Sequence, residues 1–287
     1  MNATRQQLNP LEDLHRFRAS HTAGQALVDG TQWSYIACGQ GDETLLLLPG
    51  APGRAETAFQ HILALEGDYR IIAPSYPPPL STIRAMLAGL AGIMQAEGVE
   101  KTHVIGGSYS GLIAQSFVRR FPARVSTLVL SDTGVPRRDR ARRYARYLRI
   151  VQALPLPAIR ALWRLGAYLY LRQIPHDKPF WRAYFRELTS MITKQECVGR
   201  LKIWIEFDRH SRFTPHDLDA WPGKILILQA EVDSTFPPRE RAALRKLYPQ
   251  AQTVTFPHGG HAASIAHRDQ YIAAIIQFLA LSSLAHV

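Results

Sequence analysis

The sequence predicts an α/β protein with an eight-stranded, mostly parallel sheet and an all-helical cap inserted after the sixth strand. Three observations favour this fold class. Short apolar runs alternate with helical patterns, which is typical of a parallel sheet covered on both faces. The alternation stops after Gly134 and resumes at Lys224. The excess positive charge of the chain falls inside that interruption.

Before the interruption, the pattern predicts a helical arm, an antiparallel hairpin at the sheet edge, and then strands alternating with helices. Asp29-Gly30 separates the two hairpin strands and is typical of a two-residue turn. Unbroken apolar runs predict buried strands, and apolar residues at helical spacing predict the helices. The expected elements are the arm Leu11–Arg18; the strands Gln25–Val28, Trp33–Ala37, Thr44–Leu48, Arg70–Ala73 and Thr127–Leu130, with one more leading into Gly106; and the helices Ala55–Leu65, Ser81–Glu97 and Leu112–Phe121.

The interruption itself contains four helical runs, and two strand-helix pairs follow it. The expected elements are the helices Arg137–Leu154, Ala158–Gln173, Phe180–Thr193 and Lys194–Arg209, then the strand Lys224–Leu228, the helix Pro238–Leu247, the strand Thr253–Phe256 and the helix His267–Leu281. We therefore expect a core of residues 1–134 and 217–287 and a helical, basic cap of residues 135–216.

The charge of the cap points to its partners. Of the formal net charge of +11, residues 135–216 carry 18 Lys and Arg against 6 Asp and Glu, and the rest of the chain has a net charge of −1. Seven arginines crowd one expected helix opposite an apolar stripe that runs from Tyr144 to Leu154. They are Arg137, Arg138, Arg140, Arg142, Arg143, Arg146 and Arg149.

Like charges at helical spacing destabilise a helix by a few tenths of a kcal/mol per pair, so another interaction must offset their repulsion. One interpretation is burial of the apolar stripe with the arginine stems in solvent. The other is contact with an anion: an acidic lipid surface, an acidic protein or an anionic substrate such as an acyl-CoA. No nucleic-acid-binding motif accompanies the charge, so nucleic acid is not an expected partner. The pattern predicts no oligomeric state.

Several classes of protein are excluded by composition. No apolar run approaches the roughly 18 residues of a membrane span, and Met1–Pro10 lacks the apolar core of a signal peptide. The two cysteines, Cys38 and Cys197, are far apart and lack the spacing of metal ligands or of a disulfide framework. We therefore expect a cytoplasmic protein without a bound metal.

The stretch from His103 to Gly111 is the strongest functional motif. It predicts a strand, a sharp turn and a helix, with Ser108 at the apex and Gly106 and Ser110 two residues to either side. In such a nucleophile elbow the serine takes a strained backbone conformation that exposes its hydroxyl. The motif prefers glycine where Ser110 stands, so the match is imperfect. Phosphate-binding patterns are absent, because the turn has neither Gly-x-Gly-x-x-Gly nor a Lys-Ser/Thr pair.

A serine hydroxyl needs a positioned base, and in this arrangement an acid and a histidine follow the serine along the chain. Asp233 follows the seventh expected strand and His261 follows the eighth, both in loops after carboxyl ends of strands. We therefore expect a triad of Ser108, Asp233 and His261. Asp132, after the sixth strand, and Glu231 are alternatives for the acid, and His258 is an alternative for the base.

Two backbone amides are expected to stabilise an oxyanion. One is the amide of Tyr109, the residue after the nucleophile. The other is the amide of Ala51, in the loop Pro49-Gly50-Ala51, because Gly50 lets the backbone turn inward and Pro52 has no amide to donate. Pro49 stands where many similar loops carry histidine.

On these motifs, residues 14–134 and 217–287 resemble the α/β-hydrolase superfamily. The resemblance implies hydrolysis of ester, thioester or amide bonds without a cofactor. The first half also resembles the maspardin branch and its bacterial members, through Phe17-Arg18-Ala19-Ser20, Gln32-Trp33-Ser34-Tyr35, Cys38-Gly39, Leu47-Leu48-Pro49-Gly50, Tyr69-Arg70-Ile71-Ile72-Ala73, Tyr76-Pro77 and Val99-Glu100-Lys101-Thr102-His103-Val104. That branch implies interaction roles, whereas the presence of Ser108, Asp233 and His261 favours activity in this chain.

Two functions follow as hypotheses. The first is a serine hydrolase, above all a carboxylic ester hydrolase acting on a small-molecule ester or thioester through an acyl-enzyme. The second is a non-catalytic binding scaffold on the same fold. Haloalkane dehalogenase and epoxide hydrolase chemistry is disfavoured, because both require aspartate at position 108.

Overall fold

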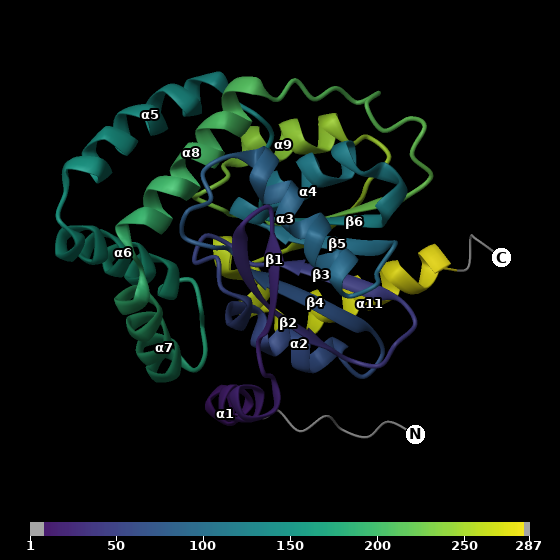
Figure 1. Cartoon of the computed structure of the whole chain (residues 1–287), viewed down its shortest axis with the longest axis horizontal. Helices are drawn as coiled ribbons and strands as arrows, with labels where there is room; N and C mark the ends of the chain where they lie inside the picture. The colour runs from purple at the N-terminus through teal and green to yellow at the C-terminus, as the bar shows by residue number, and fades with distance from the viewer. Residues whose placement is uncertain (1–8, 284–287) are drawn as a thin grey trace.

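A single eight-stranded sheet forms the centre of the computed structural model, which describes residues 9–283 (Figure 1). Residues 1–8, which hold most of the polar N-terminal run, lie outside the described residues. The strand order is β1-β2-β4-β3-β5-β6-β7-β8, and every pairing from β4 to β8 is parallel. The strands are β1 (Gly24–Val28), β2 (Thr31–Cys38), β3 (Thr44–Leu48), β4 (Arg70–Ser75), β5 (Thr102–Gly107), β6 (Val125–Ser131), β7 (Lys224–Ala230) and β8 (Gln252–Phe256).

The helices connect these strands in the predicted order. They are α1 (Pro10–Ser20), α2 (Phe59–Leu65), α3 (Ile83–Ala96), α4 (Tyr109–Arg120), α5 (Arg138–Ala153), α6 (Leu156–Leu171), α7 (Lys178–Met191), α8 (Lys194–His210), α9 (Pro238–Leu247), α10 (Ala263–Ala266) and α11 (Arg268–Ser283). The single helix expected from Ala55 is instead a 3₁₀ turn, Ala55–Ala58, followed by α2.

The sheet is buried on both faces, as its apolar strands predict. All five residues of β3 are buried, and they alternate between the two sides. Leu46 and Leu48 belong to the apolar cluster that includes residues of α3, α4 and α9, whereas Leu45 and Leu47 belong to the cluster that includes residues of α2 and α11. The predicted α/β class, with its mostly parallel sheet, is therefore confirmed.

The first two strands form the predicted antiparallel hairpin. Asp29 and Gly30 have φ values of 47° and 73°. Positive φ at both central positions is what a two-residue hairpin turn of the right twist requires.

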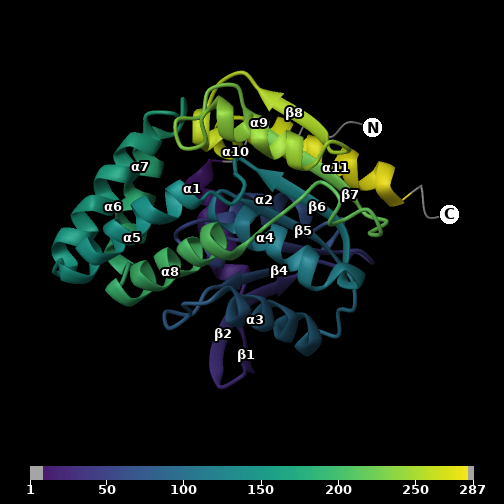
Figure 2. The same cartoon turned by 90° about the horizontal axis from the view of Figure 1, so that it is seen from above.

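Helices α5–α8 are inserted between β6 and β7 and lie together at one side of the sheet (Figures 1 and 2). Helix α5 packs along α8, and α6 packs along α7. We refer to α5–α8 as the inserted helices. No helix in the described part of the chain is long and apolar enough to cross a membrane.

The arginines of α5 do not all point to solvent, which corrects part of the sequence interpretation. Arg140 is buried, and its guanidinium forms ion pairs with Asp208 of α8, at 2.8 Å, and Glu240 of α9, at 2.6 Å. Arg137 also pairs with Glu240, at 2.6 Å. This buried network connects the inserted helices to the core and offsets part of the repulsion along α5.

Burial of the α5 stripe is also incomplete. Val151 is buried, whereas the side chain of Tyr147 is 40% exposed. Val151 packs beside Ile159 and Ile192 of the inserted segment, so the apolar stripe of α5 is buried only in part and against other inserted residues.

Candidate active site

The nucleophile elbow lies where β5 ends and α4 begins. Ser108 connects them with φ 52° and ψ −120°, a strained conformation for a residue with a side chain. Two hydrogen bonds hold it there: the Ser108 amide donates to the Ser131 carbonyl at 2.8 Å, and the Thr133 hydroxyl donates to the Ser108 carbonyl at 2.8 Å. The last residue of β6 and the loop that follows it therefore hold the backbone of Ser108 in this conformation.

The residues around the elbow are small because the backbone passes close to its neighbours. A Cβ atom on Gly106 would lie 2.6 Å from the Ser110 carbonyl oxygen. Ser110, in the position where the motif prefers glycine, is fully buried, and its hydroxyl lies 2.9 Å from the Leu48 carbonyl, to which it donates. The hydroxyl also accepts the Gly107 amide at 3.0 Å. The departure from the motif thus ties the elbow to the end of β3.

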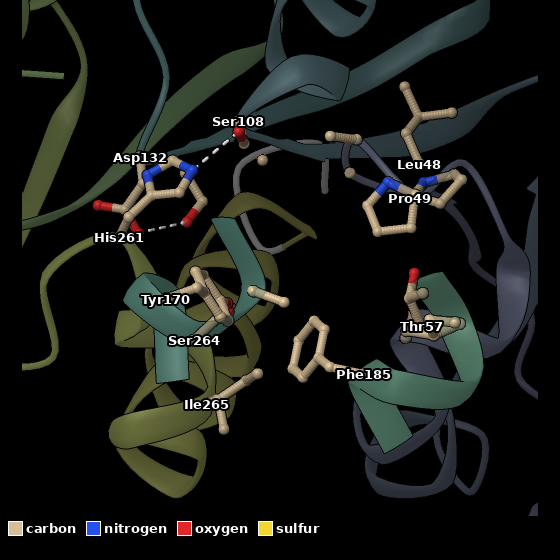
Figure 3. A pocket seen from close by; sticks show the side chains of 18 of the residues that line it. Leu48, Pro49, Thr57, Ser108, Asp132, Tyr170, Phe185, His261, Ser264 and Ile265 are labelled. Atoms are coloured by element: carbon tan, nitrogen blue, oxygen red, sulfur yellow. Dashed lines mark hydrogen bonds between the residues drawn. The ribbon is translucent and has the colours of Figure 1, made fainter. Parts of the chain in front are cut away.

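The structure brings Ser108, His261 and Asp233 into one hydrogen-bonded chain. Figure 3 shows the part of it that lies in the cavity wall, the hydrogen bond between His261 and Ser108. His261 Nε2 lies 2.9 Å from Ser108 Oγ, and His261 Nδ1 lies 2.9 Å from Asp233 Oδ2. Asp233 Oδ1 accepts the amides of Thr235 at 2.7 Å and Phe236 at 3.1 Å. The Asp233 side chain is fully buried, so these three donors replace the water that an ionised carboxylate needs.

None of the alternative residues joins this chain. Asp132 lies near His261 (Figure 3) but accepts the Ala230 amide at 2.9 Å instead. Burial raises the pKa of the Asp132 carboxyl to about 6. Glu231 and His258 are exposed.

The loop that carries His261 is shaped by two glycines and by the inserted helices. Gly259 and Gly260 have φ values of 85° and 51°. The His261 amide donates to Gln173 Oε1 at 2.6 Å, and Gln173 follows α6. The sequence analysis did not identify Gln173, because nothing in the local pattern connects it with a loop 88 residues away.

The two amides expected to bind an oxyanion belong to different elements. Tyr109 is the first residue of α4, and Ala51 lies in the loop after β3. Among the described residues, neither amide donates to a protein acceptor, so both remain available to a ligand. Arg200 of α8 packs on this loop, since a Cβ atom on Gly53 would lie 2.7 Å from its Nη2.

Ser108 opens into a cavity of about 440 Å³. The loop after β3 and the end of β6 line one side, and α6 and α7 line the other (Figure 3). Six aromatic residues of the inserted helices line this cavity: Tyr147, Trp163, Tyr170, Trp181, Tyr184 and Phe185. Tyr168 and Trp204 do not line it. The lining residues that the structure describes include no Lys or Arg.

His61 of α2 is a cavity residue that the sequence analysis counted among scattered histidines. Burial lowers its pKa to about 4, and its Nε2 has no hydrogen-bond partner among the described residues. The imidazole is therefore neutral near pH 7 and adds a single unpaired polar atom to an apolar wall.

One group of side chains has the atoms for a metal site. The ligand atoms of His21, Cys38 and Glu66 lie within 4.8 Å of one another, outside the cavity. His21 Nε2 and Glu66 Oε2 are already hydrogen-bonded at 2.6 Å. Burial raises the pKa of the Cys38 thiol to about 12, which disfavours the thiolate that a metal would bind.

Comparison with known proteins connects this geometry to a family. A 2-hydroxy-6-oxo-6-phenylhexa-2,4-dienoate hydrolase from Burkholderia cepacia is 24% identical over 271 residues, covering 84% of this chain and 89% of that protein. Maspardin from Danio rerio is 31% identical over 135 residues, 43% of each chain, so the expected similarity to maspardin is confirmed.

Among solved structures, an enol-lactonase from Burkholderia xenovorans LB400 superposes with a TM-score of 0.74 at 16% identity, over 90% of this chain and all of that one. An esterase from Thermogutta terrifontis superposes with a TM-score of 0.72 at 22% identity, over 91% and 99% of the two chains. The model of the alpha/beta hydrolase fold matches residues 43–267. The chain therefore belongs to the alpha/beta hydrolase family, and its relatives include hydrolases.

Proposed function

We propose that this protein is a serine hydrolase that cleaves carboxylic esters through an acyl-enzyme. The observation that carries the proposal is the unbroken hydrogen-bonded chain from Asp233 through His261 to Ser108, at the wall of an apolar cavity. The distances, 2.9 Å each, are those required for proton transfer between positioned groups.

In the proposed reaction, Ser108 Oγ attacks the ester carbonyl carbon while His261 Nε2 takes the hydroxyl proton. Asp233 accepts from Nδ1–H, which keeps Nε2 free to act as the base and stabilises the imidazolium. The protonated His261 then gives its proton to the departing alcohol, and the acyl group stays on Ser108. Water, activated by the same imidazole, releases the acid and restores the hydroxyl.

The tetrahedral intermediate carries a negative oxygen, which the amides of Tyr109 and Ala51 are proposed to bind. Neither amide donates to a protein acceptor within residues 9–283, which supports this role. Because donors held in place need no reorganisation as charge develops, such a pair contributes several kcal/mol to the barrier reduction.

Residues 135–216 are proposed to act as a cap on the core formed by residues 1–134 and 217–287. Supporting this division, the cavity wall combines residues of both parts: Ser108 and His261 from the core, and Tyr170 and Phe185 from the inserted helices. The core would then supply the chemistry and the cap would supply the walls that hold the acyl or alcohol group.

The cavity favours a neutral ester. A dienoate such as the substrate named for the Burkholderia cepacia relative carries a carboxylate, and no Lys or Arg lines the described cavity wall to pair with it. Burying an unpaired carboxylate costs far more than burying an apolar chain. We therefore expect turnover of p-nitrophenyl esters with apolar acyl chains to exceed turnover of that dienoate.

A fluorophosphonate probe tests the proposal directly. Labelling of the wild type but not of Ser108→Ala, with loss of ester turnover by roughly 10⁶ in the variant, is the expected result. A folded protein that neither reacts with the probe nor cleaves any ester of the series would contradict it.

That negative result would instead favour the second candidate, a non-catalytic interaction scaffold. The similarity to maspardin across 43% of the chain supports this alternative. The two functions differ in one measurable property, since a scaffold does not require a reactive Ser108.

A further inference from the structure

The outer surface of α5 and α6 exposes large apolar side chains. Of the eleven large apolar residues that are exposed in the described chain, six lie on these two helices. We call them the apolar ridge: Tyr147, Ile150, Leu162, Leu165, Tyr168 and Leu169, with exposed fractions from 40% to 57%. Single exposed apolar residues are ordinary, but six on two consecutive helices favour a contact surface.

The same two helices carry a set of exposed arginines and almost no acid. From Arg140 to His176 the sequence has eight arginines and no Asp or Glu. Six of these arginines are exposed, and none of the six pairs with a carboxylate among the described residues. We call them the basic rim: Arg142, Arg143, Arg146, Arg149, Arg164 and Arg172.

Helical spacing brings the rim next to the ridge. Arg143 precedes Tyr147 by four residues, and Arg146 precedes Ile150 by four. Residues four apart lie on the same helix face. The long arginine stems can therefore lie along the apolar side chains while their guanidinium groups reach past them.

The catalytic cavity reaches this surface. Tyr147 of α5 and Leu162 of α6 both line the cavity, yet they stay 40% and 41% exposed. Figure 2 shows α5 and α6 on the side of the molecule away from α11 and the C-terminus. A molecule bound at the ridge would therefore lie at an entrance to the cavity that contains Ser108.

We propose that the apolar ridge and the basic rim dock this protein on the surface of a membrane that contains anionic lipid. The ridge inserts among the lipid chains at the interface, and the rim pairs with the anionic headgroups. An acidic protein would satisfy the arginines, but it would not explain why the ridge coincides with the entrance to an apolar cavity. A bilayer explains both features, since it supplies apolar substrate at that entrance.

Vesicle co-sedimentation tests the docking. Wild-type protein is mixed with vesicles of phosphatidylcholine alone, or of phosphatidylcholine with phosphatidylglycerol, at low and at physiological salt. Binding only to the anionic vesicles is expected. It should weaken as salt screens the rim but remain measurable at physiological salt because the ridge is inserted.

Matched variants test whether the basic rim and the apolar ridge form the contact with the vesicle. Arg143→Gln/Arg146→Gln/Arg149→Gln should weaken binding to anionic vesicles by roughly 10–100-fold, because each cation near such a surface contributes to affinity. A control that removes three exposed core arginines, Arg84→Gln/Arg120→Gln/Arg239→Gln, should bind as the wild type does. Leu165→Ser/Tyr168→Ser should abolish binding at physiological salt. All these side chains are exposed, and circular dichroism verifies that each variant is folded.

Four outcomes would overturn the proposal. They are absent or equal binding to both vesicle types, equal weakening in the core control, full binding by Leu165→Ser/Tyr168→Ser at physiological salt, and capture of an acidic protein without any vesicle binding. Ser108→Ala should bind vesicles as the wild type does. A hydrolase that stays off vesicles therefore contradicts only the docking, and a vesicle-binding protein without esterase activity contradicts only the proposed function.

Discussion

Strand β3 and helix α6 have similarly apolar sequences but opposite environments. All five residues of β3 are buried, because helices cover both faces of the sheet. Of the sixteen residues of α6, only Ile159 and Leu171 are buried. One side of α6 lines the cavity and another faces outward. Apolar composition thus indicates the core in one region and a ligand or contact surface in the other.

The core and the inserted segment also contribute different polar groups to the site. Ser108, Asp233 and His261 come from core loops, where backbone amides hold the carboxylate. The segment that holds the inserted helices contributes supports instead: Gln173, after α6, contacts the His261 loop, and Arg200 of α8 packs on the loop that carries Ala51. Changes in the core should therefore act on the chemical step, and changes in the inserted helices on stability and alignment.

The largest effect is expected from the acid in the core. Asp233→Asn should lower kcat by about 10⁴ with the fold intact, because the amide no longer holds His261 in the required tautomer. Steady-state kinetics with a p-nitrophenyl ester measures this loss.

Asp132→Asn is its matched control. Because Asp132 bonds the Ala230 amide and not His261, turnover should stay within about tenfold of the wild type. If Asp132→Asn removed the activity and Asp233→Asn did not, the acid would be Asp132 and the assignment made here would be wrong.

The next largest effect concerns the junction between the two regions. Arg140→Met leaves the buried carboxylates of Asp208 and Glu240 without their main cation. Breaking one partner out of a buried ion-pair network costs about 3–5 kcal/mol of unfolding free energy. Urea denaturation measures it.

Arg143→Met, on the exposed side of the same helix, should change the unfolding free energy by less than about 0.5 kcal/mol. Equal losses of unfolding free energy in the two variants would mean that the buried position of Arg140 has no energetic consequence. That result would contradict the proposed difference between the two faces of α5.

A smaller effect should appear in the pH dependence of stability. Burial raises the pKa of Asp132 to about 6 in the folded protein, from 3.8. The folded state holds this proton more tightly than the unfolded chain, so stability is lost as the pH rises from about 4 through about 6. Asn cannot ionise, so the unfolding free energy of Asp132→Asn relative to wild type should rise by about 1–3 kcal/mol between pH 4 and pH 7.

The relative stability of Asp139→Asn should depend on pH in the opposite direction. Its hydrogen bond with Arg137 lowers the pKa of the exposed Asp139 carboxyl to about 2, so this group stabilises the fold above its unfolded pKa. The relative stability of Asp139→Asn should therefore fall, not rise, as the pH increases from about 2 to about 4. A common trend in the two variants would contradict the assigned environments.

The smallest effect is expected from the support that the inserted helices give to His261. Gln173→Ala removes the acceptor of the His261 amide, and the loss of one hydrogen bond of about 1 kcal/mol corresponds to a decrease of about fivefold in kcat. The rate of fluorophosphonate labelling should decrease in parallel. Arg172→Ala, at the exposed neighbouring position, should leave both rates unchanged. If Gln173→Ala also left kcat and the labelling rate unchanged, Gln173 would have no role in positioning His261.

Local patterns were sufficient for the elements of the sheet. The limits of β3 and α9 agree with the prediction to the residue, because an unbroken apolar run and a proline start are signals contained in the segment itself. The turn at Asp29-Gly30 is local in the same sense. The order Ser108, Asp233, His261 could be predicted as well, because each residue follows the carboxyl end of a strand.

Contacts between distant segments were decided by the tertiary structure alone. The sequence could not tell that Arg140 turns inward while its neighbours face solvent, because the carboxylates that bind it lie 68 and 100 residues away. The sequence favoured Asp233 as the acid but left Asp132 open, because both residues follow the carboxyl end of a strand. That choice depends on which carboxylate comes within 2.9 Å of His261 Nδ1, a distance that only the packing of the strands and loops determines.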